Sequence, residues 1–221
     1  MTQDQKDLAG TRNKKLADIL RAGPIVPVIT LDRVEDAVPL ARALVAGGLR
    51  LLEITLRTPA AVESAEAIIR DVPEAIVGIG TVLTPKDLER AQSLGARYAL
   101  SPGATPDLLD AASRSEMPFI PGITTASELM AALVHGFPTV KFFPAVAAGG
   151  IPTLKALAGP FPQARFCPTG GIDEKNARDW LALSNVVAVG GSWVCSTSDI
   201  RAQAWGEITA KAQRAVMSVK D

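Results

Sequence analysis

The sequence predicts an α/β fold, a closed (β/α)₈ barrel with one extra helix at its amino end. Eight short apolar runs recur along the 221 residues, and their starts lie 21 to 27 residues apart, a spacing that fits a strand, a loop and a helix each time. An open doubly wound sheet is the alternative, but Ile29-Thr30-Leu31-Asp32 follows the first run, where that fold usually has its glycine fingerprint. The runs begin near Ile25, Leu49, Ile76, Arg97, Pro118, Thr139, Arg165 and Val186.

Signals for helix starts lie between these runs. Thr58-Pro59, Thr84-Pro85 and Thr105-Pro106 each place a capping hydroxyl before a proline at the first helical position. Thr125 and Glu128 have the spacing of a capping box. Apolar side chains then repeat with helical period in the first two units, at Val34, Val38, Ala41, Leu44 and Val45, and at Val62, Ala65, Ile68 and Ile69.

The two ends of the chain complete the predicted fold. A short helix is expected near residues 14–21, where Leu16, Ile19 and Leu20 share one face that would cover the bottom of the barrel. Residues 200–219 are typical of a last helix. Because no linker or shift in composition divides the chain, residues 1–221 are predicted to form a single domain.

Composition argues against several classes of function. Basic and acidic residues number 23 each, so the formal net charge is zero, and no basic block indicates nucleic-acid binding. No apolar stretch approaches the roughly 20 residues of a membrane-spanning helix, and the polar amino-terminal segment lacks the apolar core of a secretory signal. Two cysteines are too few for a disulfide framework and favour a reducing cytoplasm. The cysteines and the single histidine lack metal-ligand spacing, so no metal is predicted.

Lys141 lies inside an apolar run that is typical of a buried strand. Burial disfavours the charged ammonium, so a nucleophilic amine becomes available near neutral pH, as an enzyme that forms a Schiff base with a ketone requires. The alternative is an edge-strand lysine that faces water or pairs with a carboxylate. If Lys141 faces the barrel interior, Val140 and Phe142 face the surrounding helices.

Glu53 occupies a similar position in the second run, as an ionisable group between apolar residues. Leu51, Glu53 and Thr55 share one face, so Glu53 and Lys141 would both point into the interior, where each helps the other to stay ionised. A structural buried ion pair is the alternative, and such pairs seldom add stability. The catalytic interpretation is favoured because both groups lie toward strand ends, where barrels bind their substrates.

Three further segments contribute candidate binding groups. Arg57 would clamp a substrate carboxylate through two parallel hydrogen bonds, or else be a solvated helix-start residue. The glycines of 78–81 permit close approach of a ligand and Thr81 offers a hydroxyl, although ordinary turn geometry explains them nearly as well. Gly170-Gly171 and Gly190-Gly191 follow the last two runs, where they would expose backbone N–H groups at the starts of the following helices and bind phosphate.

Four other conspicuous side chains have structural interpretations. Trp180 and Trp205 fall on helical faces and are expected in the core or in an interface. His135, near the end of the fifth helix, is expected at the surface or as a C-terminal cap. Cys167 is expected to be buried and inert.

Seven motifs, in their order and spacing, resemble those of one enzyme family. From about Ile25 to Trp193 the chain is similar to the 2-keto-3-deoxy-6-phosphogluconate (KDPG) aldolases of the Entner–Doudoroff pathway, class I aldolases that often also cleave 4-hydroxy-2-oxoglutarate (KHG). The motifs are LEITLRTP, GIGTVL, SPG, PFIPGITT, VKFFPA, RFCPTGGI and VGGSW. One position departs from the pattern, because Val146 stands where many relatives have glutamate; we expect an effect on loop packing or subunit contact more than on the reaction.

The resemblance implies a lyase without a cofactor, acting on a phosphorylated 2-oxo acid and assembled as a homotrimer. Lys141 would be the Schiff-base lysine and Glu53 the carboxylate that transfers protons. Arg57 and Thr81 would hold the pyruvate portion, with Pro102 and Phe143 lining the pocket and with Thr169, Gly170, Gly171, Gly190, Gly191 and Ser192 around the rest of the substrate and its phosphate. Another phosphate-binding barrel enzyme, such as an isomerase or epimerase, and a non-catalytic phosphosugar-binding protein are the alternatives.

Overall fold

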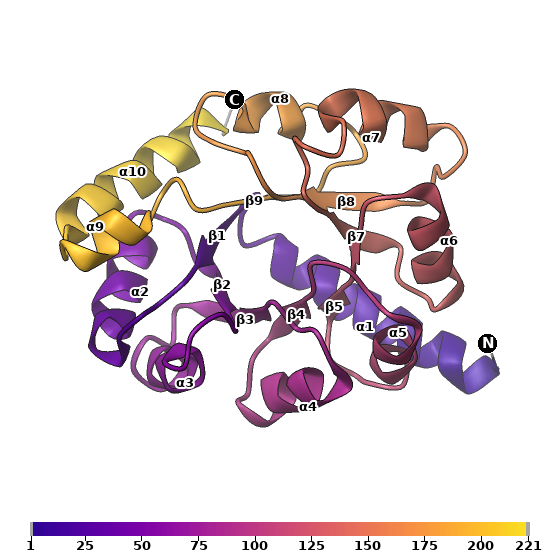
Figure 1. Ribbon diagram of the computed structural model, residues 1–221, viewed down its shortest axis with the longest axis horizontal. Coiled ribbons are helices and arrows are strands. Elements are labelled where there is room, and N and C mark those ends of the chain that lie inside the picture. The colour runs from indigo at the N-terminus through magenta and orange to yellow at the C-terminus, as the bar shows by residue number, and fades with distance from the viewer. Residues whose placement is uncertain (1, 220–221) are drawn as a thin grey trace.

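Parallel strands alternate with helices along the chain, and the helices surround the strands (Figure 1). A computed structural model describes residues 2–219; residues 1, 220 and 221, at the ends of the predicted domain, lie outside the described residues. Six strands form a curled parallel sheet in the order β5-β4-β3-β2-β1-β9, and three more form a parallel sheet in the order β6-β7-β8. The architecture is therefore α/β, with helices covering a curled sheet.

The predicted apolar runs each contain a strand. The strands are β1 (Ile25–Ile29), β2 (Leu51–Thr55), β3 (Ile76–Gly80), β4 (Tyr98–Leu100), β5 (Phe119–Ile120), β6 (Gly122–Ile123), β7 (Thr139–Phe142), β8 (Arg165–Pro168) and β9 (Val189–Gly191). The helices are α1 (Gln3–Leu20), α2 (Ala37–Ala46) after the 3₁₀ turn η1 (Val34–Asp36), α3 (Ala61–Asp71), α4 (Pro85–Ser93), α5 (Pro106–Ser113), α6 (Ala126–Val134), α7 (Gly150–Ala158), α8 (Ala177–Leu181), α9 (Thr197–Arg201) and α10 (Trp205–Ser218).

The fifth predicted strand is divided in two. Pro121 separates β5, which pairs with β4, from β6, which pairs with β7. Proline has no backbone N–H to donate to a neighbouring strand, so the ladder is interrupted there and the chain passes from one sheet to the other. At the other side, isolated bridges pair Phe166 with Val186 and Thr169 with Gly190.

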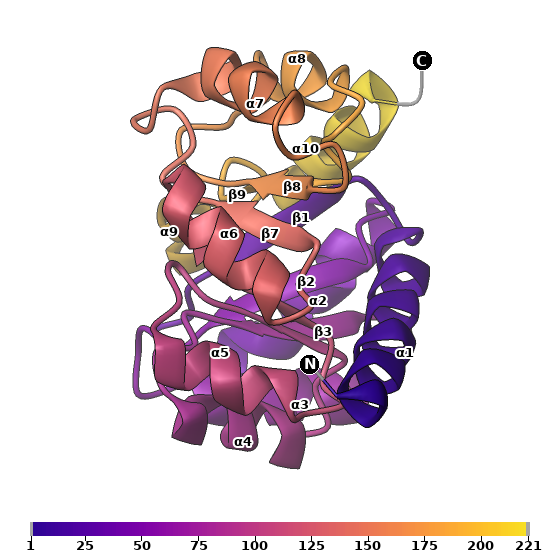
Figure 2. The same cartoon turned by 90° about the vertical axis from the view of Figure 1, so that its right-hand side faces the viewer.

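Alternate strand residues face two separate apolar clusters, as the period of a strand requires. Inward-facing residues such as Leu51 and Leu100 form the smaller cluster, which Leu16 and Ile19 of α1 close from one end. Val140 and Phe142 belong to the larger cluster that lies under the helices, as predicted for strand neighbours of an inward-facing lysine. Figure 2 shows α1 along one side of the molecule.

Helix α1 is longer than the predicted segment 14–21, because it begins at Gln3. Thr2 caps it: its hydroxyl accepts a hydrogen bond from the N–H of Gln5, whose side chain in turn accepts one from the N–H of Thr2. This capping box satisfies two of the N–H groups that a helix start leaves without partners. The prediction missed the first three turns because their residues are mostly polar.

Three of the four predicted helix caps are confirmed. Thr84, Thr105 and Thr125 are the N-caps of α4, α5 and α6, and the predicted box between Thr125 and Glu128 is present. The cap predicted at Thr58 is wrong, since α3 begins at Ala61 without a side-chain cap. The Thr58 hydroxyl instead donates to the backbone carbonyl of Leu31, which joins the loops after β1 and β2.

The last helix predicted for 200–219 is confirmed over Trp205–Ser218, but its predicted start is wrong. Two helices, α9 and α10, occupy this part of the chain. Gln203 between them adopts a left-handed conformation with φ 51°, which a helix cannot contain. Among the helices that the structure describes, none is long and apolar enough to cross a membrane.

Candidate active site

Strands β2 and β7 bring Glu53 and Lys141 together inside the molecule, although 88 residues separate them in the sequence. The Nζ of Lys141 donates to Oε1 of Glu53 at 2.8 Å. The two side chains are 3% and 1% exposed. Both are the third residue of their strand, and their inward direction follows from the strand alternation that sends their neighbours toward the helices. An amine and a carboxylate in such contact can exchange a proton without the help of solvent.

Two glycines of β3 make room for the side chains beside this pair. A Cβ built on Gly80 would overlap the carboxylate of Glu53, and one built on Gly78 would overlap the ring of Tyr98. Turn geometry alone therefore does not explain these glycines, because a side chain at either position would overlap a residue of the interior. Thr81, the residue after β3, has φ 60°, which is rare for a β-branched residue, and such conformations gather at functional sites.

Arg57 and Thr81 lie together where β2 and β3 end. The Nε of Arg57 donates to Oγ1 of Thr81 at 3.1 Å. Arg57 is exposed, so its remaining guanidinium N–H groups face a region open to solvent. The structure thus joins the two residues that the resemblance assigns to the pyruvate portion of the substrate.

Pro102 and Phe143 follow β4 and β7 at the same end of the strands. The ring centroid of Phe143 lies 5.8 Å from the Nζ of Lys141, and this side chain is half-buried. The backbone of Pro102 packs so closely on Gly122 that a Cβ there would overlap it. Gly122 is also the strand partner of Lys141, so Pro102 stands one strand away from the amine.

The glycine pairs do not lie where the sequence predicted them. Gly190 and Gly191 belong to β9 itself, and the next helix begins only at Thr197; α8 likewise begins at Ala177, well beyond Gly170 and Gly171. The expectation that they open helices is therefore wrong. Gly170 and Gly171 have φ values of 103° and 79°, which only glycine adopts freely.

The second glycine pair makes room for neighbouring side chains. A Cβ on Gly190 would overlap the hydroxyl of Thr169, and one on Gly191 would overlap the indole of Trp193. Thr169 is buried, whereas Ser192 is exposed. These residues remain close together at the ends of β8 and β9, because Thr169 and Gly190 form a bridge between the strands.

The loops after β7 and β8 are bonded to one another. The N–H of Ala145 donates to the carbonyl of Thr169 at 2.8 Å, and the N–H of Val146 donates to that of Gly170 at 3.0 Å. The side chain of Val146 lies beside Gly171 and is half exposed. Val146 therefore belongs to the packing between these two loops.

Comparisons with known proteins identify the family. The family model described as KDPG and KHG aldolase matches residues 16–211. The chain belongs to this aldolase family. It is 52% identical over 202 residues to the KHG/KDPG aldolase of Escherichia coli K12, and this alignment covers 91% of the chain and 95% of that relative. It is 53% identical over 198 residues to the 2-dehydro-3-deoxy-phosphogluconate aldolase of Dickeya dadantii, with 90% and 93% covered.

A solved structure of the same aldolase family is similar throughout. The KDPG aldolase of Legionella pneumophila, determined with pyruvate captured as a covalent carbinolamine, is 48% identical to the chain. It superposes with a TM-score of 0.89 and covers 91% of the chain and 98% of the Legionella protein.

Tyr98 and Cys167 adjoin the pair of Lys141 and Glu53, and sequence reasoning missed Tyr98. Cys167 is the strand partner of Lys141 and is buried as predicted. Burial raises the pKa of its thiol to about 12, so it stays protonated at neutral pH. Tyr98 is wholly buried, and a signal for it was its place in a short apolar strand, two residues before Leu100 on the inward face.

The remaining predicted residues have structural positions. Trp180 lies in the core, and Trp205 is partly buried and packs against the core cluster. His135 is the C-cap of α6; its Nδ1 lies 2.7 Å from the carbonyl oxygen of Ala131 and its Nε2 lies 3.1 Å from the carboxylate of Asp110. Within residues 2–219 no three His, Cys, Asp or Glu side chains gather closely enough to hold a metal ion.

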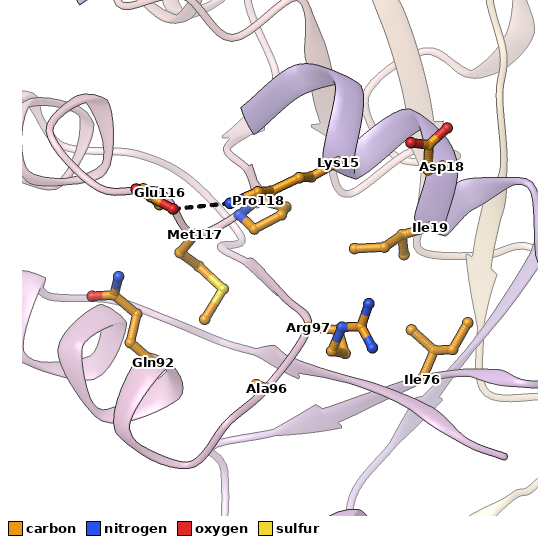
Figure 3. Close-up of a pocket in the computed structure, with 10 residues that line it drawn as sticks. All are labelled: Lys15, Asp18, Ile19, Ile76, Gln92, Ala96, Arg97, Glu116, Met117 and Pro118. Atoms are coloured by element: carbon orange, nitrogen blue, oxygen red, sulfur yellow. Dashed lines mark hydrogen bonds and ion pairs between the residues drawn. The ribbon is translucent and has the colours of Figure 1, made fainter. Parts of the chain in front are cut away.

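A cavity of about 610 Å³ opens at the other end of the strands, beside α1 (Figure 3). Ile76 begins β3 there and Arg97 immediately precedes β4. The Nζ of Lys15 forms an ion pair with Glu116 at 2.9 Å along one side. Because parallel sheets covered by helices bind their substrates at the carboxyl ends of the strands, this cavity does not form part of the candidate active site.

Proposed function

We propose that the chain is a class I aldolase that cleaves 2-dehydro-3-deoxy-6-phosphogluconate (KDPG) to pyruvate and glyceraldehyde 3-phosphate, and that also cleaves 4-hydroxy-2-oxoglutarate to pyruvate and glyoxylate. The observation that supports this most is the buried contact of 2.8 Å between Lys141 and Glu53. A nucleophilic amine with an adjacent proton acceptor is what Schiff-base chemistry on a 2-oxo acid requires. The covalent pyruvate adduct of the Legionella relative is consistent with this chemistry.

The reaction begins when Lys141 gives a proton to Glu53 and its free amine attacks the C2 carbonyl of the substrate. Glu53 returns this proton to the oxygen of the resulting carbinolamine and carries a second one there from the nitrogen, so that the oxygen leaves as water, Glu53 is ionised again and an iminium ion remains. The iminium accepts the electron pair of the C3–C4 bond when that bond breaks. Glu53, directly or through one water molecule, takes the proton of the C4 hydroxyl as the aldehyde leaves. The enamine is then protonated at C3 and hydrolysed, which releases pyruvate and restores the amine.

The residues around Lys141 and Glu53 bind different parts of the substrate. Arg57 and Thr81, bonded to each other at 3.1 Å, hold the carboxylate end beside Lys141. Pro102 and Phe143 line the pocket. The segments after β8 and within β9, with Thr169, Gly170, Gly171, Gly190, Gly191 and Ser192, surround the remaining carbons and the phosphate.

We also propose that the enzyme is a closed barrel. The two sheets together form one closed eight-stranded barrel, in which β5 and β6 count as a single strand; the bridges between the β8 and β9 segments support this closure. Residues 1–221 form one domain, which acts in the cytoplasm as a homotrimer and without a cofactor. Sedimentation of the purified protein tests the trimer, which a mass of one or two chains would contradict.

Borohydride trapping tests the mechanism. Pyruvate and borohydride are expected to leave a covalent adduct on Lys141, located by mass spectrometry, and Lys141→Arg is expected to remove both the adduct and the activity, because guanidinium is not a nucleophile. Glu53→Gln is expected to slow cleavage about 10²- to 10⁴-fold, the usual contribution of a proton-transferring group. An isomerase, an epimerase or a phosphosugar-binding protein would give no adduct.

A coupled assay tests the substrates. Cleavage of either substrate releases pyruvate, which lactate dehydrogenase reports through oxidation of its nicotinamide cofactor. Comparison of kcat/KM for the two substrates under the same conditions measures the preference between them. Release of no pyruvate from either substrate would reject the proposed function.

A further inference from the structure

Three neighbouring strands place Glu53, Gly78 and Tyr98 at one level of the interior. Gly78 pairs with Glu53 on β2 at one side and with Tyr98 on β4 at the other. The middle position of this row has no side chain. The two outer residues therefore approach each other across Gly78 without an intervening group.

The side chains fill that space from both sides. An ideal Cβ on Gly78 would overlap Cζ of Tyr98, the carbon that bears the hydroxyl, so the ring reaches across the middle strand toward Glu53. The carboxylate of Glu53 lies over Gly80, two residues further along the same strand. The hydroxyl of Tyr98 and the carboxylate of Glu53 are thus neighbours above β3.

Each of these side chains has one buried polar atom without a hydrogen-bond partner among the described residues. These atoms are the Tyr98 hydroxyl oxygen and Oε2 of Glu53, the carboxylate oxygen that Lys141 does not contact. Buried polar atoms nearly always have a partner, either in the protein or in an enclosed water molecule. Two such atoms on facing side chains provide the donor and the acceptor that one water molecule needs.

We propose that Tyr98 is a positioning residue for Glu53: its hydroxyl donates, through one enclosed water molecule, to Oε2 and holds the carboxylate with Oε1 against Lys141. This inference rests on the proposed function, in which Glu53 exchanges protons with Lys141 and with the substrate. The Tyr98 hydroxyl forms no hydrogen bond with the amine. It acts through the orientation and the charge of Glu53.

The surroundings keep Tyr98 a neutral donor. Burial first, and the charge of Glu53 second, raise the pKa of Tyr98 well above its ordinary value. The other titratable neighbour is Cys167 on β8, which is itself protonated at neutral pH because burial raises its pKa to about 12. Helix α1 contributes the apolar Leu16 and Ile19 to the same cluster.

Removal of the Tyr98 hydroxyl is therefore expected to change the pH dependence of cleavage in one direction. A hydrogen bond to a charged carboxylate favours the charged form, and loss of the Tyr98 hydroxyl takes one such bond away from the Oε2 side. In Tyr98→Phe the acidic limb of the kcat/KM profile is expected to move up by about half to one pH unit, and KM is expected to change less than kcat. The ring stays, so packing is conserved.

Ser64→Ala is the matched control. The Ser64 hydroxyl on α3 is likewise buried and without a partner among the described residues, but its helix packs through Ala65 and Ile68 on the larger cluster and not on the one with Tyr98. Its removal is expected to leave the pH profile of cleavage in place. Thermal unfolding of both variants checks that each is folded.

A double-mutant cycle decides whether Tyr98 acts through Glu53. The rate of pyruvate adduct formation, trapped with borohydride, is measured for the parent, Tyr98→Phe, Glu53→Gln and the double variant. Tyr98→Phe is expected to slow the parent severalfold and to have no further effect when residue 53 is glutamine. An equal effect in both backgrounds, or an unchanged acidic limb, overturns the inference alone, whereas a parent that forms no adduct overturns the proposed function and the inference with it.

Discussion

Gly80 determines where the carboxylate of Glu53 lies. Its missing side chain leaves the space that the carboxylate occupies, and Glu53 is held there by Lys141 at 2.8 Å. A single methyl group at this position would therefore compete with the proposed proton acceptor. The atoms that such a methyl group would displace are Cγ, Cδ and Oε1 of Glu53 and none of the backbone.

Gly80→Ala is expected to lower kcat/KM by about 10- to 100-fold, since displacement of a reacting group by about 1 Å has effects of that size. Adduct formation with pyruvate is expected to slow in parallel, and the melting temperature to change little. Gly103→Ala is the control, because a Cβ at Gly103 meets no atom within 4 Å. Steady-state kinetics of the two variants measure the difference, and equal activities would show that the carboxylate tolerates the methyl group.

Strand alternation alone predicted that Glu53 and Lys141 face the interior, because each is an ionisable residue between apolar neighbours. Tyr98 could not be identified in the same way. Tyrosine is common in strands, and its contact with the site depends on Gly78, which is a neighbour through strand pairing and not through the sequence. Tertiary neighbours of this kind are invisible to a pattern along one segment.

At the scale of the elements, threonine caps were predictable where a polar residue lies three positions on or a proline follows. Thr84, Thr105 and Thr125 cap their helices. Thr58 also precedes a proline, as Thr84 and Thr105 do, but its hydroxyl bonds to Leu31 in another loop. A tertiary hydrogen bond can replace a local cap, so the helix start moves to Ala61.

Helices α9 and α10 are joined by an ion pair that the prediction of one helix missed. Oδ2 of Asp199 accepts hydrogen bonds from the Ser196 hydroxyl at 2.6 Å and from the Nζ of Lys211 at 2.8 Å. The Lys211 hydrogen bond first, and that of Ser196 next, lower the pKa of Asp199 below its ordinary value. Asp199 thereby caps one helix and docks the other.

Asp199→Asn is expected to destabilise the protein by about 1 kcal/mol at pH 7, the usual contribution of a cap together with a partly buried ion pair. A carboxyl whose pKa is lowered by folding adds stability above its unfolded pKa of about 4, and this stability is lost as the pH falls through the folded value. The difference between variant and parent should therefore shrink below about pH 4. Urea unfolding at several pH values measures it.

Asp87→Asn is the control for Asp199→Asn. Asp87 holds the same third position in the capping box of α4, where it bonds to Thr84, but no ion pair to it occurs within the described part of the chain. Asp87→Asn is expected to lower the free energy of unfolding by less than Asp199→Asn does. An equal loss in both variants would assign the effect to capping and not to Lys211.

For the molecule as a whole, the spacing of apolar runs predicted the order of strands and helices, because each run must be buried and each amphipathic segment must cover it. The spacing did not predict how α1 is attached. Arg12 stands among polar and charged residues, as in an exposed helix. Its partners lie about a hundred residues away, so only the assembled fold defines them.

Arg12 fastens α1 to the outer helices. It is 1% exposed, and its guanidinium lies 4.1 Å from the ring centroid of Phe137. It donates to the carbonyls of Ala112 at 3.0 Å and Gly136 at 3.2 Å, at the ends of α5 and α6. Burial lowers the pKa of Arg12 to about 10, which still leaves it charged at neutral pH, where the negative ends of two helix dipoles favour a cation.

Arg12→Met keeps much of the side-chain volume but removes every donor, so carbonyls at two helix ends lose their partners. We expect a loss of about 2–4 kcal/mol, which in a chain of this length lowers the melting temperature by roughly 5–15 °C. Lys14→Met on the exposed face of α1 is the control and is expected to change it little. Because Arg12 lies at the end of the strands away from Lys141, kcat below the transition should stay near that of the parent. Thermal unfolding at one fixed protein concentration measures the change in melting temperature, and the coupled assay measures kcat. A melting temperature unchanged by Arg12→Met would show that α1 is held by its apolar face alone.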